Sequence, residues 1–408
     1  MLLLFNINVH SFAEKINIQI VEEQTLKSNP SIALAKLDLD NAKREYKSSF
    51  DAFLPKVNFV VNTIRKNQEN ILIQGYSYGL NVSLSLFSGF SNYNEVKSKA
   101  ARVKVKEAAY KRVVCDAIYK VNKEYIKLMW AYENFELLKQ IKEKRIENRD
   151  LIKLKYSSGN VDIGSLKREE ADVMMAECKL MNARRYILAA SVALMEAMGK
   201  IDNVTILETD ERLMLLNDIV EEPDYSNLIT MIPEFKIAKY ELEICKYEKA
   251  IAIGQWLPLL AFSGNFLKSN EKWMPDQNNL TTGIYFSCPI FTGGKRYADT
   301  KICSNNFKEA SLKLINTISF LKSSMVKRYN SLIDVHDSVR IIENYLSALK
   351  LQAEISTKKY VNGLESYYNW YAIEKDFIDT QRMLLDAKKN VALEKAKWRN
   401  FIGVSLNG

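Results

Sequence analysis

Apolar residues in the first half of the chain recur at alternating steps of four and three residues. The run consists of Val114, Ile118, Val121, Tyr125, Leu128, Tyr132 and Phe135. Steps of this kind are typical of the seam of a coiled coil. The surrounding stretch, 92–156, contains no proline and corresponds to about 95 Å of helix at 1.5 Å per residue. The pattern therefore predicts one long coiled-coil helix over 92–156.

A second helix is expected to run back along the first. Gly159 follows Tyr156-Ser-Ser, and glycine is the residue that most often ends a helix. Beyond it, apolar residues continue at the same alternating steps from Val173 to Ala197. This spacing predicts a return helix over 164–198 and hence an antiparallel helical hairpin.

Before the long helix, the spacing changes to an alternation of apolar and small polar residues. Every second residue is apolar from Val57 to Val61 and again from Tyr76 to Leu86. A period of two predicts strands near 56–64 and 76–87. Ahead of them, Ile20–Phe53 is predicted to form one helix, which ends where Pro55 interrupts the helical hydrogen bonds.

The second half of the chain repeats these signals about 204 residues later. Leu86-Phe-Ser-Gly89 corresponds to Ile290-Phe-Thr-Gly293, Tyr156 and Gly159 to Tyr360 and Gly363, and Met198-Gly199 to Ile402-Gly403. A constant offset over separated motifs indicates an internal duplication. We therefore divide the chain into a first repeat over 14–199 and a second over 226–404. The second is expected to contain a helix, strands near 259–267 and 281–290, a long helix over 295–360 and a return helix over 365–402.

The four predicted strands have the pattern of strands in an outer-membrane barrel. They lack almost all charged residues, and their tyrosines and phenylalanines gather toward the segment ends, as in an aromatic girdle. A half-buried strand of a soluble sheet shows the same alternation but normally carries charges on its polar face. Four strands alone would leave two unpaired edges in lipid, so the chain is expected to oligomerise. Two copies would give eight strands and a filled interior, and three would give twelve strands and an open lumen.

Two further segments lie outside the repeats. Residues 1–13 are largely apolar and end in Ser11-Phe-Ala13, a triplet suited to signal-peptidase cleavage. We expect a signal-peptide remnant there, with an ordinary frayed terminus as the alternative. Residues 200–225 are expected to form an acidic linker between the repeats.

Composition narrows the function further. The chain has two histidines and five cysteines without metal-ligand spacing, and it lacks the glycine-rich phosphate-binding motifs and the nucleophile elbow. We therefore expect no enzyme, no metal and no cofactor. The 58 Lys and Arg residues alternate with 49 Asp and Glu residues, which favours solvated helix faces over nucleic-acid binding.

Taken in order, the motifs resemble those of the TolC-like outer membrane efflux proteins, also called outer membrane factors, over residues 16–404. The motifs that carry the resemblance are Asn29-Pro30, Leu54-Pro55, Leu86 to Gly89, Tyr156 to Gly159, Gly199, Leu257-Pro258, Pro289 to Gly294 and Gly403. The resemblance implies an α+β membrane protein of a Gram-negative cell. It would form a homotrimer with a twelve-stranded barrel in outer-membrane lipid and a periplasmic tunnel of long antiparallel coiled-coil helices.

The resemblance also implies partners and a site. The tunnel of this family meets a periplasmic adaptor, or membrane fusion protein, and an inner-membrane pump of the RND or ABC type. The glycine-bearing tips of the helical hairpins receive the adaptor. In this chain the tip residues are Tyr156, Gly159, Val161, Tyr360, Gly363 and Leu364.

The aperture of the tunnel departs from the best-known family member. Asn369 and Ala372 stand where that protein has acidic residues, and Glu365 stands where it has an arginine that closes the aperture with a tyrosine matched by Tyr360. Asp162 and Glu365 remain as acidic tip residues, with a solvated turn as the alternative role. We hypothesise that the aromatic residues Tyr367, Tyr368, Trp370 and Tyr371 hold the aperture, and core packing is an equal alternative.

The expected function is that of an exit duct in a tripartite efflux or type I secretion system. Substrate would move passively through a water-filled tube while the pump supplies the energy. The alternative is a trimeric coiled-coil scaffold or adhesin of the cell envelope without a through-pore.

Overall fold

The computed structural model describes residues 14–68, 71–200, 205–213 and 222–403. The expected signal-peptide remnant, 1–13, and the parts 201–204 and 214–221 of the expected acidic linker lie outside these residues. The chain divides into two units. We call 35–111 with 233–320 the sheet unit, and 1–34 with 112–232 and 321–408 the helical unit.

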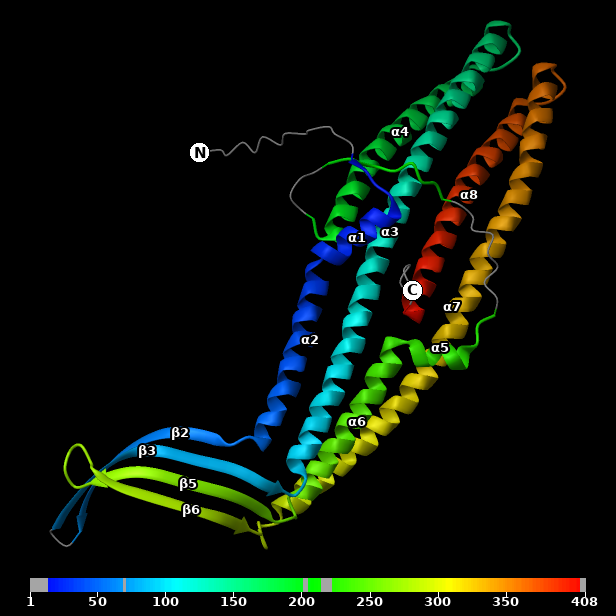
Figure 1. Cartoon of the computed structure of the whole chain (residues 1–408). Helices are drawn as coiled ribbons and strands as arrows, with labels where there is room; N and C mark the ends of the chain where they lie inside the picture. The colour runs from blue at the N-terminus through cyan, green and yellow to red at the C-terminus, as the bar shows by residue number, and fades with distance from the viewer. Residues whose placement is uncertain (1–13, 69–70, 201–204, 214–221, 404–408) are drawn as a thin grey trace, which may run out of the picture. The chain divides into compact units, whose positions relative to one another are not determined.

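The sheet unit contains one antiparallel sheet of four strands (Figure 1). In spatial order these are β2 (Lys56–Gln68), β3 (Ile71–Ser88), β5 (Leu259–Asn270) and β6 (Gln277–Ser287). Each repeat supplies one hairpin, and β3 pairs with β5 to join the two hairpins. Consequently β2 and β6 are the two edges of the sheet.

The register places most of the apolar residues of the four strands on one face. Phe59 lies opposite Leu80, Leu80 opposite Phe266, and Phe266 opposite Leu280, and residues that lie opposite each other point to the same side of a sheet. These side chains are not covered, since Phe59 is 68% and Leu280 71% exposed. The protomer therefore has a bare apolar sheet face.

The strands differ from the sequence-based bounds mainly at the turns. β2 extends to Gln68 and β3 begins at Ile71, because backbone pairing continues through polar residues where the apolar alternation is lost. β6 occupies Gln277–Ser287 rather than 281–290, and Pro289, just beyond it, has no N–H group for a strand ladder.

The segment that precedes β2 along the chain forms several short helices instead of one long helix. The prediction of a single helix over Ile20–Phe53 is wrong, since α1 (Ile18–Ser28), α2 (Pro30–Ser48) and a short 3-10 helix, η1 (Ser49–Phe53), replace it. Asn29 has extended backbone angles (φ −71°, ψ 120°), because a residue before proline avoids the helical conformation. The second repeat is interrupted in the same way between α5 (Tyr225–Met231) and α6 (Pro233–Gly254).

The strands connect to the long helices through a close backbone approach within the sheet unit. Gly89 follows β3 with a φ of +61°, and a Cβ atom on it would lie 2.1 Å from the carbonyl oxygen of Gly254. A side chain at position 89 would therefore be strained and would also clash with backbone.

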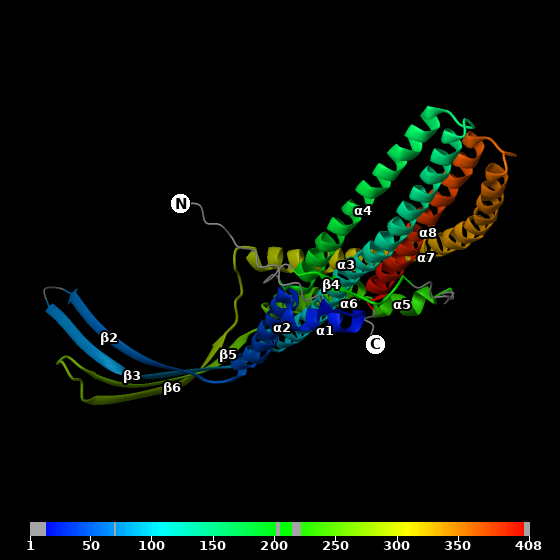
Figure 2. The ribbon, with the colours of Figure 1, turned by 90° about the horizontal axis from the view of Figure 1, so that it is seen from above.

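The helical unit consists mainly of two antiparallel hairpins, shown next to each other in Figure 2. One pairs α3 (Ser91–Ser157) with α4 (Ile163–Met198), and the other pairs α7 (Lys295–Val361) with α8 (Tyr367–Ile402). A short parallel pair, β1 (Glu14–Lys15) with β4 (Leu207–Glu208), lies beside them. α8 begins at Tyr367 rather than 365 because Ser366 caps its first turn.

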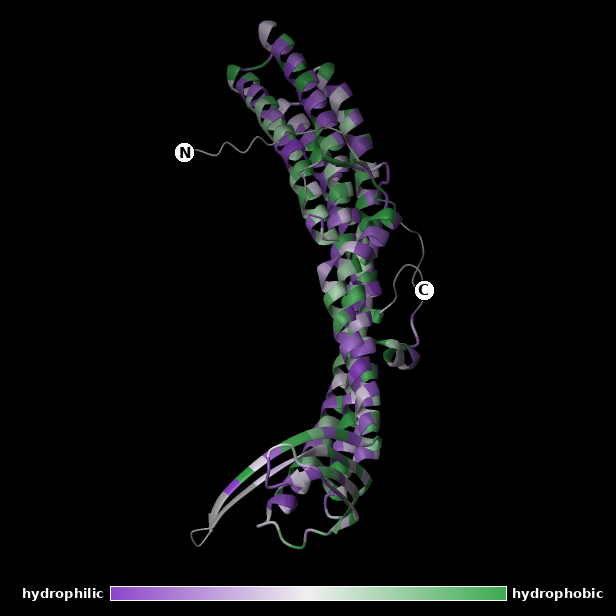
Figure 3. Ribbon diagram, turned by 60° about the vertical axis from the view of Figure 1, so that its left-hand side comes forward, coloured by the Kyte–Doolittle hydropathy of each residue, from purple (hydrophilic) through white to green (hydrophobic). Residues whose placement is uncertain are grey.

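The seam of apolar residues forms the core of this unit. Val121, Tyr125 and Leu128 of α3 are fully buried with Leu194 of α4. In α7, Met325, Leu332 and Val339 are buried. Lys322, which the spacing places in the seam, is exposed, and the neighbouring Leu321 is buried instead. Polar and apolar residues alternate along the helices (Figure 3). Within the described ranges, none of the helices combines the length and apolar composition needed to cross a membrane.

Candidate functional site

Backbone hydrogen bonds close the turn at the tip of the first hairpin. Gly159, at a φ of +73°, donates its N–H to the carbonyl of Tyr156 at 2.9 Å, and Asn160 donates to Lys155 at 2.9 Å. These two bonds form a Schellman motif, which ends a helix through a left-handed residue. Asp162 then caps α4 by accepting the N–H of Ser165 at 2.9 Å. Asp162 is therefore a helix-capping residue of the exposed turn.

The tip of the second hairpin has the same construction. Gly363, at a φ of +74°, donates to Tyr360 at 3.1 Å, and Leu364 donates to Lys359 at 2.8 Å. Ser366 accepts the N–H of Asn369 at 3.3 Å and occupies the capping position of Asp162. Glu365 instead accepts the Ser356 hydroxyl at 2.5 Å and an N–H of the Asn369 side chain.

The expected tip residues differ in accessibility. Leu364 is 76% exposed, Tyr156 is exposed, and nothing lies within 4 Å of a Cβ atom built on Gly159 or Gly363. Val161 is half-buried, and Tyr360 is buried. The accessible surface of the two tips is thus formed by the glycine turns and Leu364 rather than by Tyr360.

Below the turns, the two hairpins pack through a cluster of aromatic side chains. We call this the tip cluster, and it consists of Ile152, Leu166, Tyr360, Tyr367, Trp370 and Tyr371. Trp370 is 0% exposed, stacks on Tyr360 with ring centroids 4.7 Å apart, and donates its indole N–H to Thr357 at 3.1 Å. Three of the four aromatic aperture candidates, Tyr367, Trp370 and Tyr371, are therefore buried between the helices of the chain, as the core-packing alternative requires. Tyr368 differs, since it is 69% exposed.

Hydrogen bonds also join α8 to α4 across the tip cluster. The Tyr367 hydroxyl donates to Glu169 Oε1 at 3.0 Å, and the Tyr371 hydroxyl donates to Asp172 Oδ2 at 2.7 Å. Arg145 of α3 lies 3.4 Å from the same Asp172 oxygen. The first and second repeats are thus connected at their tips by polar contacts as well as apolar ones.

Glu169 is the least solvated charged group of this region. Its side chain is 0% exposed, and its Oε2 atom has no hydrogen-bond partner among the described residues. Burial raises the pKa of Glu169, against the opposing effects of the Tyr367 hydrogen bond and the Arg145 charge. Burial likewise raises the pKa of Tyr360 to about 12.

Sequence reasoning did not single out Glu169, Asp172 or Arg145. The sequence did contain one signal for Glu169. This residue lies four positions before Val173, at a seam position of α4, and the later seam positions of α4 are occupied by apolar residues. A carboxylate at a seam position indicates a buried acid with a partner. The identity of that partner depends on how α8 packs on α4, which no local pattern specifies.

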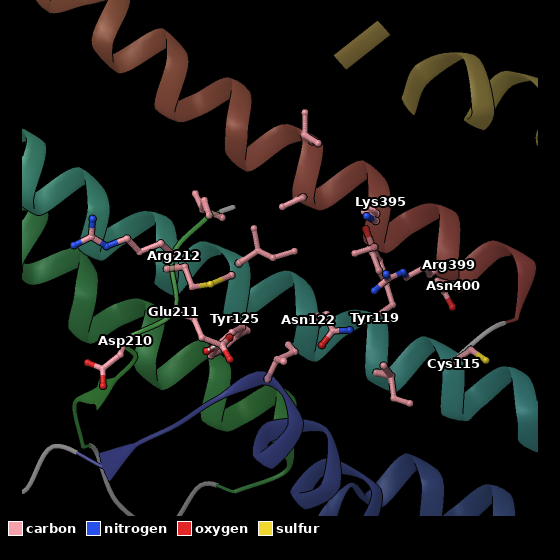
Figure 4. Close-up of a pocket in the computed structure, with 18 residues that line it drawn as sticks. Cys115, Tyr119, Asn122, Tyr125, Asp210, Glu211, Arg212, Lys395, Arg399 and Asn400 are labelled. Carbon is pink, nitrogen blue, oxygen red and sulfur yellow. Dashed lines mark hydrogen bonds between the residues drawn. The ribbon is translucent and has the colours of Figure 1, made fainter. Parts of the chain in front are cut away.

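A separate cavity of about 630 Å³ lies within the helical unit (Figure 4). Figure 4 shows Glu211 beside Tyr125 of α3, and Lys395 and Arg399 of α8 also line the cavity. The buried Tyr125 donates its hydroxyl hydrogen to Glu211 at 2.7 Å. None of the expected tip residues lines this cavity. In the part of the chain that the structure describes, no group of three or more His, Cys, Asp or Glu side chains is arranged to hold a metal ion.

The structure is similar to several solved outer-membrane channels. CusC has a TM-score of 0.86 at 14% sequence identity, over 97% of this chain and 94% of that chain. VceC of Vibrio cholerae has a TM-score of 0.84 at 16% identity, over 95% and 96%. The open state of MtrE of Neisseria gonorrhoeae has a TM-score of 0.83 at 15% identity, over 95% and 88%. At these identities the likeness establishes the fold.

The sequence itself also matches a family. No curated protein matches the chain. Residues 21–200, which include most of α1, all of α2, the first pair of strands and the first helical hairpin, match the model of the outer membrane efflux proteins. Together with the shared channel fold, this match confirms the resemblance of the chain to the outer membrane efflux proteins and supports a location in the outer membrane.

Proposed function

We propose that three copies of this chain form a closed twelve-stranded barrel that acts as the exit duct of a tripartite efflux or type I secretion system. The observation that carries the proposal is the four-stranded sheet, with its uncovered apolar face and its two open edges. β2 and β6 have unpaired backbone groups on their outer sides, and such groups cannot remain unpaired in lipid.

Closure of the sheet satisfies these edges. If β6 of one copy pairs with β2 of the next, three copies supply twelve strands and no edge remains. The lengths are suitable, since β6 has 11 residues and β2 has 13, and a strand needs about 9–11 residues to cross the bilayer at a tilt. The apolar face of the sheet would then contact outer-membrane lipid.

The long helices supply the second part of the duct. α3 and α7 have 67 residues each, or about 100 Å of helix at 1.5 Å per residue, which suits a tunnel through the periplasm. The duct needs no catalytic residue, because substrate moves through water and an inner-membrane pump of the RND or ABC type supplies the energy.

The tips are the proposed docking site of the periplasmic adaptor. Gly159, Gly363 and Leu364 are accessible, and the two turns have matching geometry, so that one kind of adaptor hairpin could contact both. Tyr368, Asn369 and Asp162 are the exposed candidates for the aperture, whereas Glu365 is half-buried.

The test is the conductance of the purified, detergent-extracted protein in a planar bilayer, with its oligomeric mass measured on the same sample. A trimer with discrete conductance steps is the expected result. A trimer that never conducts, even after the tips are loosened by Tyr368→Ala, would favour an envelope scaffold without a through-pore. A water-soluble monomer would refute the barrel.

A further inference from the structure

The apolar face of the sheet carries positive charges at one end only, the end with the hairpin turns. The row Phe59, Leu80, Phe266 and Leu280 is entirely apolar. In the next row toward the turns, Lys268 lies opposite Tyr78, and two rows further Arg65 lies opposite Gln74. Residues in register point to the same side of the sheet, so both cations lie on the apolar face.

Neither cation meets a carboxylate among the residues that the structure describes. Within the described strands and turns, Arg65 and Lys268 form no ion pair, and Arg65 is exposed. The carboxylates nearest to Lys268 along the chain, Glu271 and Asp276, belong to the turn between β5 and β6 rather than to the strand rows, and Glu69, the nearest to Arg65, lies outside the described residues. Asp276 there accepts a hydrogen bond from the side chain of Asn270 at 2.6 Å.

Aromatic side chains mark the same level of the sheet. Tyr76 lies in the row between those of Lys268 and Arg65. Its ring meets Trp273 edge-on, with centroids 5.3 Å apart, and Trp273 is 75% exposed. Tyrosine and tryptophan favour the headgroup level of a membrane, because one part of the ring is apolar and the other is polar. The two cations therefore lie about 7 Å to either side of this level, at about 3.4 Å per residue along a strand.

We propose that Arg65 and Lys268 bind the phosphate groups of an anionic, doubly phosphorylated glycolipid of the outer leaflet. This inference rests on the proposed barrel, which turns the apolar face toward lipid. Four residues along a strand and two strands across separate the two Cα atoms by about 16 Å, and flexible side chains reach several ångströms from each. The guanidinium of Arg65 suits bidentate contact with one phosphate, and the ammonium of Lys268 can bend from the apolar face toward a second.

The test compares lipid retention by the full chain and two variants. The protein in detergent is incubated with a defined doubly phosphorylated glycolipid, with phosphatidylethanolamine as the zwitterionic probe, and bound lipid is counted by native mass spectrometry. The double variant Arg65→Gln, Lys268→Gln is expected to bind the glycolipid about tenfold more weakly than the unmodified protein does. Lys56→Gln is the matched control, because Lys56 lies next to Val57 and therefore on the opposite face, at the far end of β2.

The inference would be overturned by equal binding of the two lipids by the unmodified protein, by equal glycolipid binding by the double variant, or by an equal loss in Lys56→Gln. Displacement of the glycolipid by millimolar inorganic phosphate would also overturn it, by showing a site for the free ion. Conductance of the double variant is measured in parallel. A variant that conducts normally but loses the glycolipid supports the inference, whereas an unmodified protein that neither trimerises nor conducts refutes the proposed function independently.

Discussion

Replacing Tyr367 with phenylalanine removes one hydroxyl from the tip cluster and keeps the ring. That hydroxyl donates to Glu169 Oε1 at 3.0 Å, while Glu169 Oε2 already lacks a partner among the described residues. The variant therefore leaves a fully buried carboxyl group without a hydrogen bond. Such a loss costs about 1–3 kcal/mol, and we expect the contact between α4 and α8 to weaken by that amount.

Hydrogen exchange of backbone amides measures this loss locally. The amides of α4 around Glu169 and of α8 around Trp370 report opening of the tips. Since 1.4 kcal/mol corresponds to a factor of ten, Tyr367→Phe should accelerate their exchange by about 5- to 150-fold. Tyr368→Phe is the matched control, because it removes the same hydroxyl from the neighbouring residue, which is 69% exposed, and it should change exchange less than twofold.

Two results would refute the reasoning. Equal exchange in Tyr367→Phe and the unmodified protein would mean that the hydroxyl contributes nothing to the contact. An equal acceleration throughout α1 and α3 would mean that the substitution acts on the whole helical unit rather than on the link between the hairpins.

Three further predictions concern the same elements. Burial raises the pKa of Glu169 above its ordinary value of 4.5. Its protonated form therefore stabilises the tips fully below about pH 4.5, and this stabilisation is lost as the pH rises through the raised pKa. Hydrogen exchange of the α4 amides, corrected for the intrinsic exchange rate, should accelerate across that pH window in the unmodified protein but not in Glu169→Gln. Gly363→Ala should cost only about 1–2 kcal/mol of backbone strain, since nothing lies within 4 Å of a Cβ atom at this position. In Gly89→Ala the new Cβ also clashes with the Gly254 carbonyl. The yield of folded protein in parallel membrane preparations should therefore fall several-fold more for Gly89→Ala than for Gly363→Ala. Tyr368→Ala should raise single-channel conductance if this exposed ring narrows the aperture; unchanged conductance would remove Tyr368 from the aperture candidates.

Local signals were sufficient where the structure depends on neighbours in the chain. Gly159 and Gly363 end their helices because glycine adopts the left-handed conformation that a Schellman turn requires. The family could be predicted for a related reason, since its motifs are turns and helix ends, and these recur in order within one sequence. The break at Asn29-Pro30 is also local, because proline restricts the residue before it, but the prediction of one helix over Ile20–Phe53 missed it.

Contacts between distant elements could not be predicted in this way. Lys322 fits the spacing of the seam, yet Leu321 fills the core, because the rotation of α7 about its axis is decided by the helices that pack on it. Tyr367 and Tyr371 look alike as aperture or core residues until α4 supplies Glu169 and Asp172 as their partners.

The sequence by itself therefore indicated the motifs that recur about 204 residues apart, the two kinds of periodicity, the tip turns and the family resemblance, since each motif depends on residues close together in the chain. Only the tertiary structure decided which aromatic rings are buried, which carboxylates they meet and which cations share the apolar face of the sheet. These depend on the register of strands and the packing of helices up to about 200 residues apart, where the free energy of burial, rather than local conformational preference, selects the partner.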